Sequence, residues 1–153
     1  MFIKTVIDAL NKADIQYALV GGYAVALHGA VRGTVDLDFV IALDEQQYEQ
    51  LENALISIGL TPRLPVSAKE VFQFREEYIN NRNLIAWSFN NTHNPLELID
   101  IIITHDAKKM KTKTLTVDGM AIEIATIGEL IKMKKASSRP QDLEDIRALE
   151  KLQ

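Results

Sequence analysis

The sequence contains no cysteine among its 153 residues. This absence excludes disulfide bonds, metal sites built from thiolates and cysteine nucleophiles, and it fits a reducing compartment. No apolar run approaches the length needed to cross a membrane. The first residues also lack the charged segment followed by an apolar segment that characterises a signal peptide. We therefore expect a cytoplasmic protein that does not interact with membranes.

An excess of basic residues is also missing. The chain has 17 lysines and arginines against 21 aspartates and glutamates, which gives a formal net charge of −4. This balance gives no sign of a general nucleic-acid scaffold, although it leaves room for a local basic patch. Internal repeats, low-complexity tracts and Gly/Ser-rich linkers are absent as well. Residues 1–153 are therefore predicted to form one domain with a substantial core.

The periodicity of apolar residues predicts an α+β fold, a mixed sheet of five or six strands with flanking helices. Strands are expected at residues 15–20, 34–42, 60–64, 84–89, 96–104, 112–117 and 120–125. Helices are expected at residues 2–13, 23–28, 44–58, 127–137 and 138–152, and a further helix begins at Ser67 without a clear end. Asp118-Gly119 is the strongest hairpin signal in the chain.

Asp36 and Asp38 stand one residue apart in the predicted strand 34–42. Alternate residues of a strand face the same side, so both carboxylates point one way while Leu37 and Phe39 face the core. Two carboxylates side by side on a largely buried strand repel each other and lose hydration. A bound divalent cation is the simplest compensation. Acidic residues are also common on solvent-facing strands, so the pair alone is compatible with a metal site and with an exposed strand face.

A third acid, Asp100, lies in another predicted strand and shares a face with Leu98 and Ile102. It points into apolar surroundings unless a functional cavity lies there, and a hydrogen-bonded structural acid is the alternative. Together the three acids describe one site, in which carboxylates on adjacent strands hold two Mg²⁺ ions about 3.5–4 Å apart for phosphoryl transfer. Oxygen ligands alone favour Mg²⁺ or Mn²⁺ over zinc. The turn at Gly21-Gly22 is where a phosphate would sit.

The sequence has neither a P-loop motif, G-x-x-x-x-G-K-[ST], nor a G-x-G-x-x-G after its first predicted strand. Instead, Gly21-Gly22 is followed after eleven residues by Thr34-Val-Asp36-Leu-Asp38-Phe. This pattern resembles the signature of the polymerase-beta-like nucleotidyltransferase superfamily. It is most similar to a minimal bacterial branch that includes AbiE-type toxins and small antibiotic nucleotidyltransferases.

The resemblance implies transfer of a nucleoside monophosphate from an NTP to an acceptor hydroxyl, with release of pyrophosphate. In this interpretation Asp36 and Asp38 bind both metal ions. Asp100 holds the metal that activates the acceptor oxygen and also takes its proton. Gly21 and Gly22 present backbone N–H groups to the triphosphate at the start of a helix.

The resemblance extends to residues 130–146, which are similar to the closing helices of the same branch. Lys134 continues the apolar face of its helix, which aims its ammonium at the sheet. There it either contacts the triphosphate or covers apolar surface with its stem. Arg139 and Asp142 stand at a predicted helix start, where capping and pairing are more common than ligand binding.

Two further residues accompany the acid pair. Arg32 is a candidate contact for the triphosphate, and its alternative is a structural pair with an acid of the closing helices. Thr34 is a candidate for a hydrogen bond to a metal ligand, although β propensity alone explains a threonine in a strand.

The sequence leaves the acceptor open. A tRNA 3′ end, a protein hydroxyl and a small hydroxylated antibiotic are all candidates. A toxin role implies a cognate antitoxin as partner. Because the chain is short, the acceptor pocket must use the segment around residues 60–95 or a second subunit of a homo-oligomer. The alternative function is an inactive module of the same fold that binds nucleotide or a partner protein without catalysis.

Overall fold

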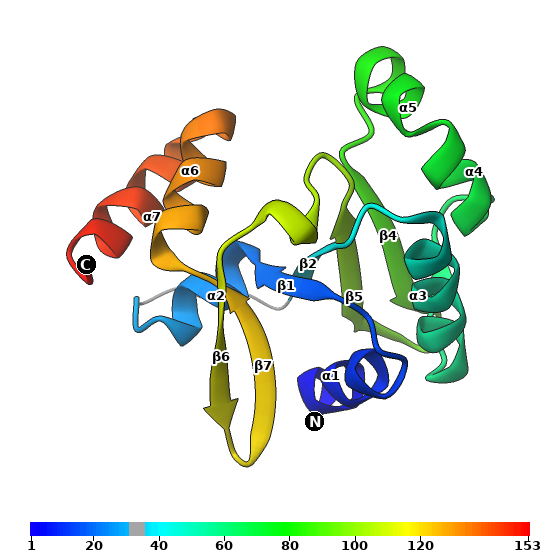
Figure 1. Ribbon diagram of the computed structural model, residues 1–153, viewed down its shortest axis with the longest axis horizontal. Coiled ribbons are helices and arrows are strands. Elements are labelled where there is room, and N and C mark those ends of the chain that lie inside the picture. The colour runs from blue at the N-terminus through cyan, green and yellow to red at the C-terminus, as the bar shows by residue number, and fades with distance from the viewer. Residues whose placement is uncertain (31–35) are drawn as a thin grey trace.

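The computed structural model describes residues 1–30 and 36–153. A seven-stranded mixed sheet in the order β3-β4-β5-β2-β1-β7-β6 runs through the molecule. Its strands are β1 (Tyr17–Val20), β2 (Leu37–Ile41), β3 (Thr61–Pro62), β4 (Ala86–Asn91), β5 (Asn94–Ile102), β6 (Thr112–Val117) and β7 (Met120–Ala125). The helices are α1 (Phe2–Lys12), α2 (Gly21–Leu27), α3 (Glu45–Ser57), α4 (Ala68–Gln73), α5 (Arg75–Arg82), α6 (Ile127–Ser137) and α7 (Pro140–Glu150), with a 3₁₀ helix η1 at Ala107–Lys109. Helices α3, α4 and α5 gather on one side of the molecule and α6 and α7 on the other (Figure 1).

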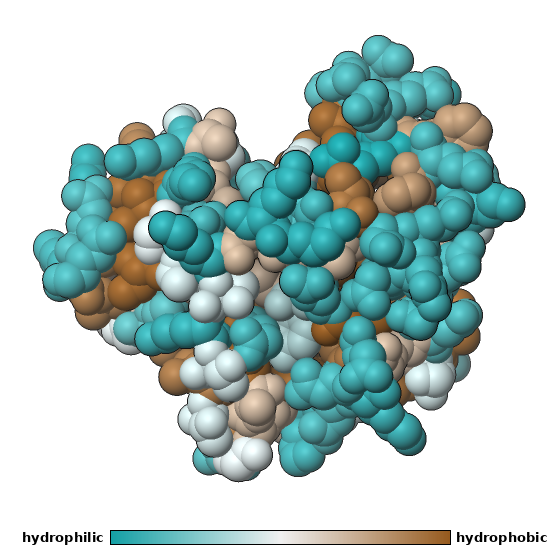
Figure 2. All heavy atoms as spheres, viewed as in Figure 1, coloured by the Kyte–Doolittle hydropathy of each residue, from teal (hydrophilic) through white to brown (hydrophobic). Residues whose placement is uncertain are grey.

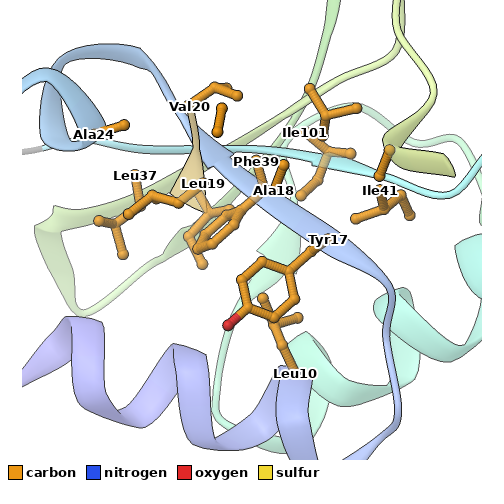
Figure 3. Close-up of a cluster of buried hydrophobic side chains, with 14 of the residues drawn as sticks. Leu10, Tyr17, Ala18, Leu19, Val20, Ala24, Leu37, Phe39, Ile41 and Ile101 are labelled. Atoms are coloured by element: carbon orange, nitrogen blue, oxygen red, sulfur yellow. The ribbon is translucent and has the colours of Figure 1, made fainter. Parts of the chain in front are cut away.

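The centre of the sheet fixes the register of the acidic strand. β2 pairs antiparallel with β1 on one side and parallel with β5 on the other. All four residues of β1 are buried, as is usual for a central strand covered on both faces. Tyr17 and Phe39 pack edge to face in this core, with 5.6 Å between their ring centroids (Figure 3). A slip of one residue would turn such side chains out of the core, so the register is strongly specified.

The sheet has seven strands, more than the five or six that we expected, because every predicted strand joins it. β3 is a two-residue edge strand on β4, and the β6–β7 hairpin joins through a parallel pairing of β7 with β1 at Leu19 and Ile124. Pairing between strands so far apart in the chain leaves no local signal in the sequence. The described part of the predicted strand 34–42 is β2, and Asp36 lies immediately before it.

Two helix starts follow their capping residues. The Asp44 side chain accepts two backbone N–H groups at the start of α3, and Ser67 forms a capping box with Glu70 at the start of α4. α4 ends at Gln73, and the next helix, α5, was not predicted. None of the residues of α5 is buried, so it carries no apolar stripe to indicate a helix. No helix within the described residues is long and apolar enough to span a membrane.

Candidate active site

A pocket of about 420 Å³ lies where the sheet meets the closing helices. Its lining comes from the β1–α2 turn, β2, the β4–β5 hairpin and the α6–α7 region: Val20, Gly21, Gly22, Asp36, Asp38, Ile85, Ala86, Asp100, Ile102, Thr104, His105, Met133, Lys134, Ser137 and Arg139. Figure 2 shows a recess between the lobe that contains α6 and α7 and the lobe that contains α4 and α5. The lining residues come from distant parts of the sequence, so only the tertiary fold creates this pocket.

The three acids named from the sequence all line this pocket. Asp38 and Asp100 are direct partners across the parallel β2–β5 pair, so their side chains leave the sheet on the same face. Asp36 lies two residues before Asp38, just outside β2. Asp100 and its apolar neighbour Ile102 line the same pocket. The Asp100 side chain therefore faces a cavity, one of the two possibilities that its place in the sequence left open.

Gly21 is packed directly against Asp38. Its φ is +71°, in the left-handed region, and a Cβ on Gly21 would overlap the carboxylate of Asp38. Glycine is therefore required at this position for two reasons, the backbone conformation and the close approach. Gly21 and Gly22 are the first residues of α2, and Gly22 is buried. The turn thus lies beside the acids rather than at a separate site.

The charge distribution of the pocket centres on Asp38. Its pKa is raised from 3.8 to about 7, first by burial and then by the negative charges of Asp100 and Asp36. The positive charges of Lys134 and Arg139 oppose this shift in the pKa of Asp38. The pocket therefore places three acids opposite two cations, and the repulsion among the acids is only partly compensated.

Asp100 has a protein partner on the neighbouring strand. Ser88 is its partner across the antiparallel β4–β5 pair, and the Ser88 hydroxyl donates to Oδ1 of Asp100 at 2.5 Å. A hydroxyl donor of this kind holds a carboxylate in one orientation. Ser88 was not identified from the sequence, because the register of the β4–β5 hairpin shifts between Asn90 and Asn91 and a simple alignment of the two predicted strands does not place it opposite Asp100.

The cations of the pocket belong to the closing helices and are themselves paired. Lys134 is buried, and its Nζ lies 2.9 Å from Oδ2 of Asp145. Arg139 donates from Nε to Oδ2 of Asp142 at 3.0 Å, the capping and pairing arrangement expected for these two residues. Arg139 nevertheless keeps 75% of its side chain exposed, so its guanidinium remains accessible from the pocket.

His105 also lines the pocket and was not assigned to the site from the sequence. Its Nδ1 lies 2.8 Å from the Thr104 hydroxyl oxygen, and burial lowers the pKa of its imidazole. A neutral imidazole can donate and accept hydrogen bonds at the same time. Its position in the turn after β5 gave no recognisable spacing to another ligand.

Two predicted site residues, Arg32 and Thr34, lie outside the described residues. Within residues 1–30 and 36–153, no three His, Asp or Glu side chains are arranged as a ready metal-binding group. The chemistry of the donors nevertheless fits a hard divalent cation, because Asp36, Asp38 and Asp100 offer only carboxylate oxygens. Such a cation would offset the repulsion that raises the pKa of Asp38.

Comparison with known proteins agrees with this architecture. The family model of the aminoglycoside-2''-adenylyltransferases matches residues 2–127. The solution structure of the antibiotic-resistance factor ANT(2'')-Ia has a TM-score of 0.64 at 12% identity, over 97% of this chain and 80% of that chain. The crystal structure of ANT(2'')-Ia with adenylyl-2''-tobramycin has a TM-score of 0.61 at 13% identity, over 98% and 90% of the two chains. A putative nucleotidyltransferase from Thermotoga maritima has a TM-score of 0.61 at 14% identity, over 95% and 88%. A search of curated proteins found no match.

The range matched by the family model contains the Gly21-Gly22 turn and all three acids, and the similar structures share the overall fold at low sequence identity. The match covers well over half of the chain. The protein therefore belongs to the aminoglycoside-2''-adenylyltransferase family and is a nucleotidyltransferase with a polymerase-beta-like fold.

Proposed function

We propose that this protein transfers a nucleoside monophosphate from an NTP to a hydroxyl group of a small molecule, with Mg²⁺ or Mn²⁺ as cofactor and pyrophosphate as the second product. The observation that carries this proposal is the pairing of Asp38 with Asp100 across adjacent parallel strands, with Asp36 in the same pocket. Three carboxylates on one face, opposite cations, match the needs of nucleotidyl transfer, in which negative charge must be neutralised and the reactants aligned.

Each acid has a separate task in the proposed reaction. Asp36 and Asp38 would hold the divalent ions, which neutralise charge on the triphosphate when bound. The acceptor oxygen attacks the α-phosphorus and forms a new P–O bond, while the bond to the β-phosphate oxygen breaks and pyrophosphate leaves with that electron pair. The proton of the acceptor hydroxyl passes to Asp100, which Ser88 holds in orientation.

The triphosphate is expected at the opposite side of the pocket from the acceptor. Gly21 and Gly22 bring the backbone close to the acids, and Lys134 supplies a positive charge in the same lining. Arg32 and Thr34 remain candidates for triphosphate and metal-ligand contacts. Positive groups opposite the acids are what an anionic substrate with a divalent ion requires.

A small hydroxylated, cationic molecule of the aminoglycoside type is the acceptor that we favour. The related ANT(2'')-Ia has been solved with adenylyl-2''-tobramycin, which is a nucleotidylated aminoglycoside. The pocket contains three acids and the whole chain has a net charge of −4, which suits a cationic acceptor better than an RNA 3′ end. RNA and protein acceptors are the alternatives for the test. The toxin role, the cognate antitoxin, the homo-oligomer and the cytoplasmic location stay sequence-based predictions.

Labelled nucleotides provide the test. Each of the four α-labelled NTPs is incubated with the protein, Mg²⁺ and one acceptor class: an aminoglycoside panel, tRNA or cell-extract protein. We expect label on a small molecule, dependent on Mg²⁺ and lost in Asp36→Asn, whereas the exposed variant Asp8→Asn keeps full labelling. Label on RNA or protein would reassign the acceptor. No label with any acceptor, together with retained nucleotide binding by Asp36→Asn, would establish the non-catalytic binding module instead.

A further inference from the structure

The ammonium of Lys134 is held in the pocket by two buried acids of the last helix. Nζ of Lys134 lies 2.9 Å from Oδ2 of Asp145 and 3.7 Å from Oδ1 of Asp142. Only 9% of the Lys134 side chain is exposed, and the two acids are 5% and 2% exposed at their side chains. We propose that Asp145 is a positioning residue that fixes the ammonium of Lys134 for contact with the triphosphate. This inference rests on the proposed function, because it assigns the triphosphate to that pocket.

Such a residue is needed because a lysine side chain is long and flexible. Both its freedom and its hydration are lost when the ammonium is buried, and a buried ammonium without a carboxylate is strongly disfavoured. Lys134 has lost nearly all its exposure, so its position depends on the carboxylate beside it. A pre-positioned charge does not have to be ordered again when the nucleotide binds, which favours affinity.

The two acids of α7 are not equivalent. Asp142 accepts from Nε of Arg139 at 3.0 Å, from the Arg139 backbone N–H at 3.0 Å and from the Ser137 hydroxyl at 2.8 Å. Through these contacts Asp142 binds the segment that connects α6 to α7. Asp145 lies one helical turn further along, and its Oδ2 makes the short contact with Lys134, while Gln141 donates to its Oδ1 at 3.2 Å. The position of the ammonium is therefore set mainly by Asp145.

The alternative is that the Lys134–Asp145 pair only holds α6 against α7. The placement of Lys134 favours a role in the site. Its side chain belongs to the same pocket lining as the three acids, which a contact that only joins α6 to α7 does not require. Asp145 lies beyond residues 2–127, so the family match does not assign it a role.

A double-mutant cycle on the full-length protein separates the two explanations. The dissociation constants of α,β-methylene analogues of the four NTPs are measured by calorimetry with Mg²⁺ for the wild type, Asp145→Asn, Lys134→Met and the double variant. Because the analogues do not turn over, binding is measured without catalysis. Thermal melts of each variant report folding. Glu144→Gln is the matched control, because Glu144 is the exposed neighbour of Asp145 on the same helix.

We expect Asp145→Asn to raise the dissociation constant about tenfold, which corresponds to about 1.4 kcal/mol. When Asp145→Asn is added to the Lys134→Met variant, the dissociation constant should change by less than about twofold, because the effect of Asp145 acts through Lys134. Glu144→Gln should bind like the wild type. If Asp145→Asn does not fold, Asp145→Glu replaces it, since this variant keeps the charge and moves the carboxylate by one methylene. The same dependence on Lys134 is expected.

Two results would overturn the inference in different ways. If the wild type binds an analogue and the effects of the two substitutions are independent, or if Asp145→Asn lowers only the melting temperature, the pair is a helix–helix contact and the proposed function stands. If the folded wild type binds none of the four analogues, the proposed function itself fails and this inference fails with it.

Discussion

Gly21 and Asp38 are in such close contact that a single methyl group cannot be inserted between them. Gly21 is the first residue of α2, directly after β1, and Asp38 lies in β2, so the tight turn and the acid pair of the sequence form one structural unit. The position of the Asp38 carboxylate is therefore limited by the backbone of the β1–α2 turn as well as by β2.

Gly21→Ala should abolish nucleotidyl transfer while the protein still folds. The new methyl group displaces the carboxylate of Asp38, and φ of +71° adds strain of about 1 kcal/mol. Gly59→Ala is the control, because Gly59 also has a positive φ but nothing lies within 4 Å of an added Cβ. It should lose only the stability that the backbone strain costs, about 1 kcal/mol, and keep its activity. Equal activity in the two variants would show that the Gly21–Asp38 contact has no functional role.

Asp38→Asn should stabilise the protein above neutral pH. The pKa of Asp38 is raised from 3.8 to about 7 in the folded state, so between these values the folded protein keeps a proton that the unfolded chain has lost. The free energy of unfolding of the wild type therefore falls as pH rises from about 4 to about 7. Asparagine does not titrate, so the Asp38→Asn variant keeps its stability as the pH rises. Its free energy of unfolding should exceed that of the wild type by on the order of 2–4 kcal/mol above pH 7 and by almost nothing near pH 4.

Denaturant unfolding at pH 4, 6 and 8 without metal measures this difference. Asp8→Asn is the control, because Asp8 is exposed and forms an i,i+4 ion pair with Lys4. Its effect should be below about 1 kcal/mol at each pH. An advantage of Asp38→Asn that does not change between pH 4 and pH 8 would contradict the raised pKa.

Ser88→Ala should lower the turnover number about tenfold with little change in KM for the NTP. The Ser88 hydroxyl donates to Oδ1 of Asp100, and its removal leaves the carboxylate free to rotate away from the acceptor oxygen. The loss of one hydrogen bond should cost about 1 kcal/mol of stability. Ser57→Ala is the control, since the Ser57 hydroxyl donates to the Ala54 carbonyl on α3, outside the pocket. A turnover number reduced equally in both variants would indicate a general loss of stability.

Mg²⁺ together with an NTP should raise the melting temperature of the wild type. At a hundred times the dissociation constant, a ligand adds about 2.7 kcal/mol to stability, which for a chain of this size corresponds to roughly 5–10 °C. Asp36→Asn removes one oxygen ligand and should lose most of this shift. Chelation of the metal with EDTA should have the same effect on the wild type. A shift that survives both changes would argue that nucleotide binds without the acids.

Some features were predictable from local sequence. Asp44 and Ser67 mark the starts of α3 and α4 through side-chain capping, and Asp118-Gly119 marks the β6–β7 hairpin because few residues accept its backbone conformation. α5 was missed because a helix with no buried residue has no apolar periodicity to detect.

The sequence by itself predicted that Asp36 and Asp38 lie in one site, because side chains alternate along a strand, and that the first strand ends at Gly21-Gly22. Only the tertiary structure decided that Asp100 joins them. That proximity depends on the parallel pairing of β2 with β5, strands with long intervening segments between them. The partners of Lys134 were decided in the same way, since the packing of α7 on α6, and not any local pattern, brings Asp145 to its ammonium. Local conformational preferences act over a few residues, whereas contacts between distant segments depend on how the whole core packs.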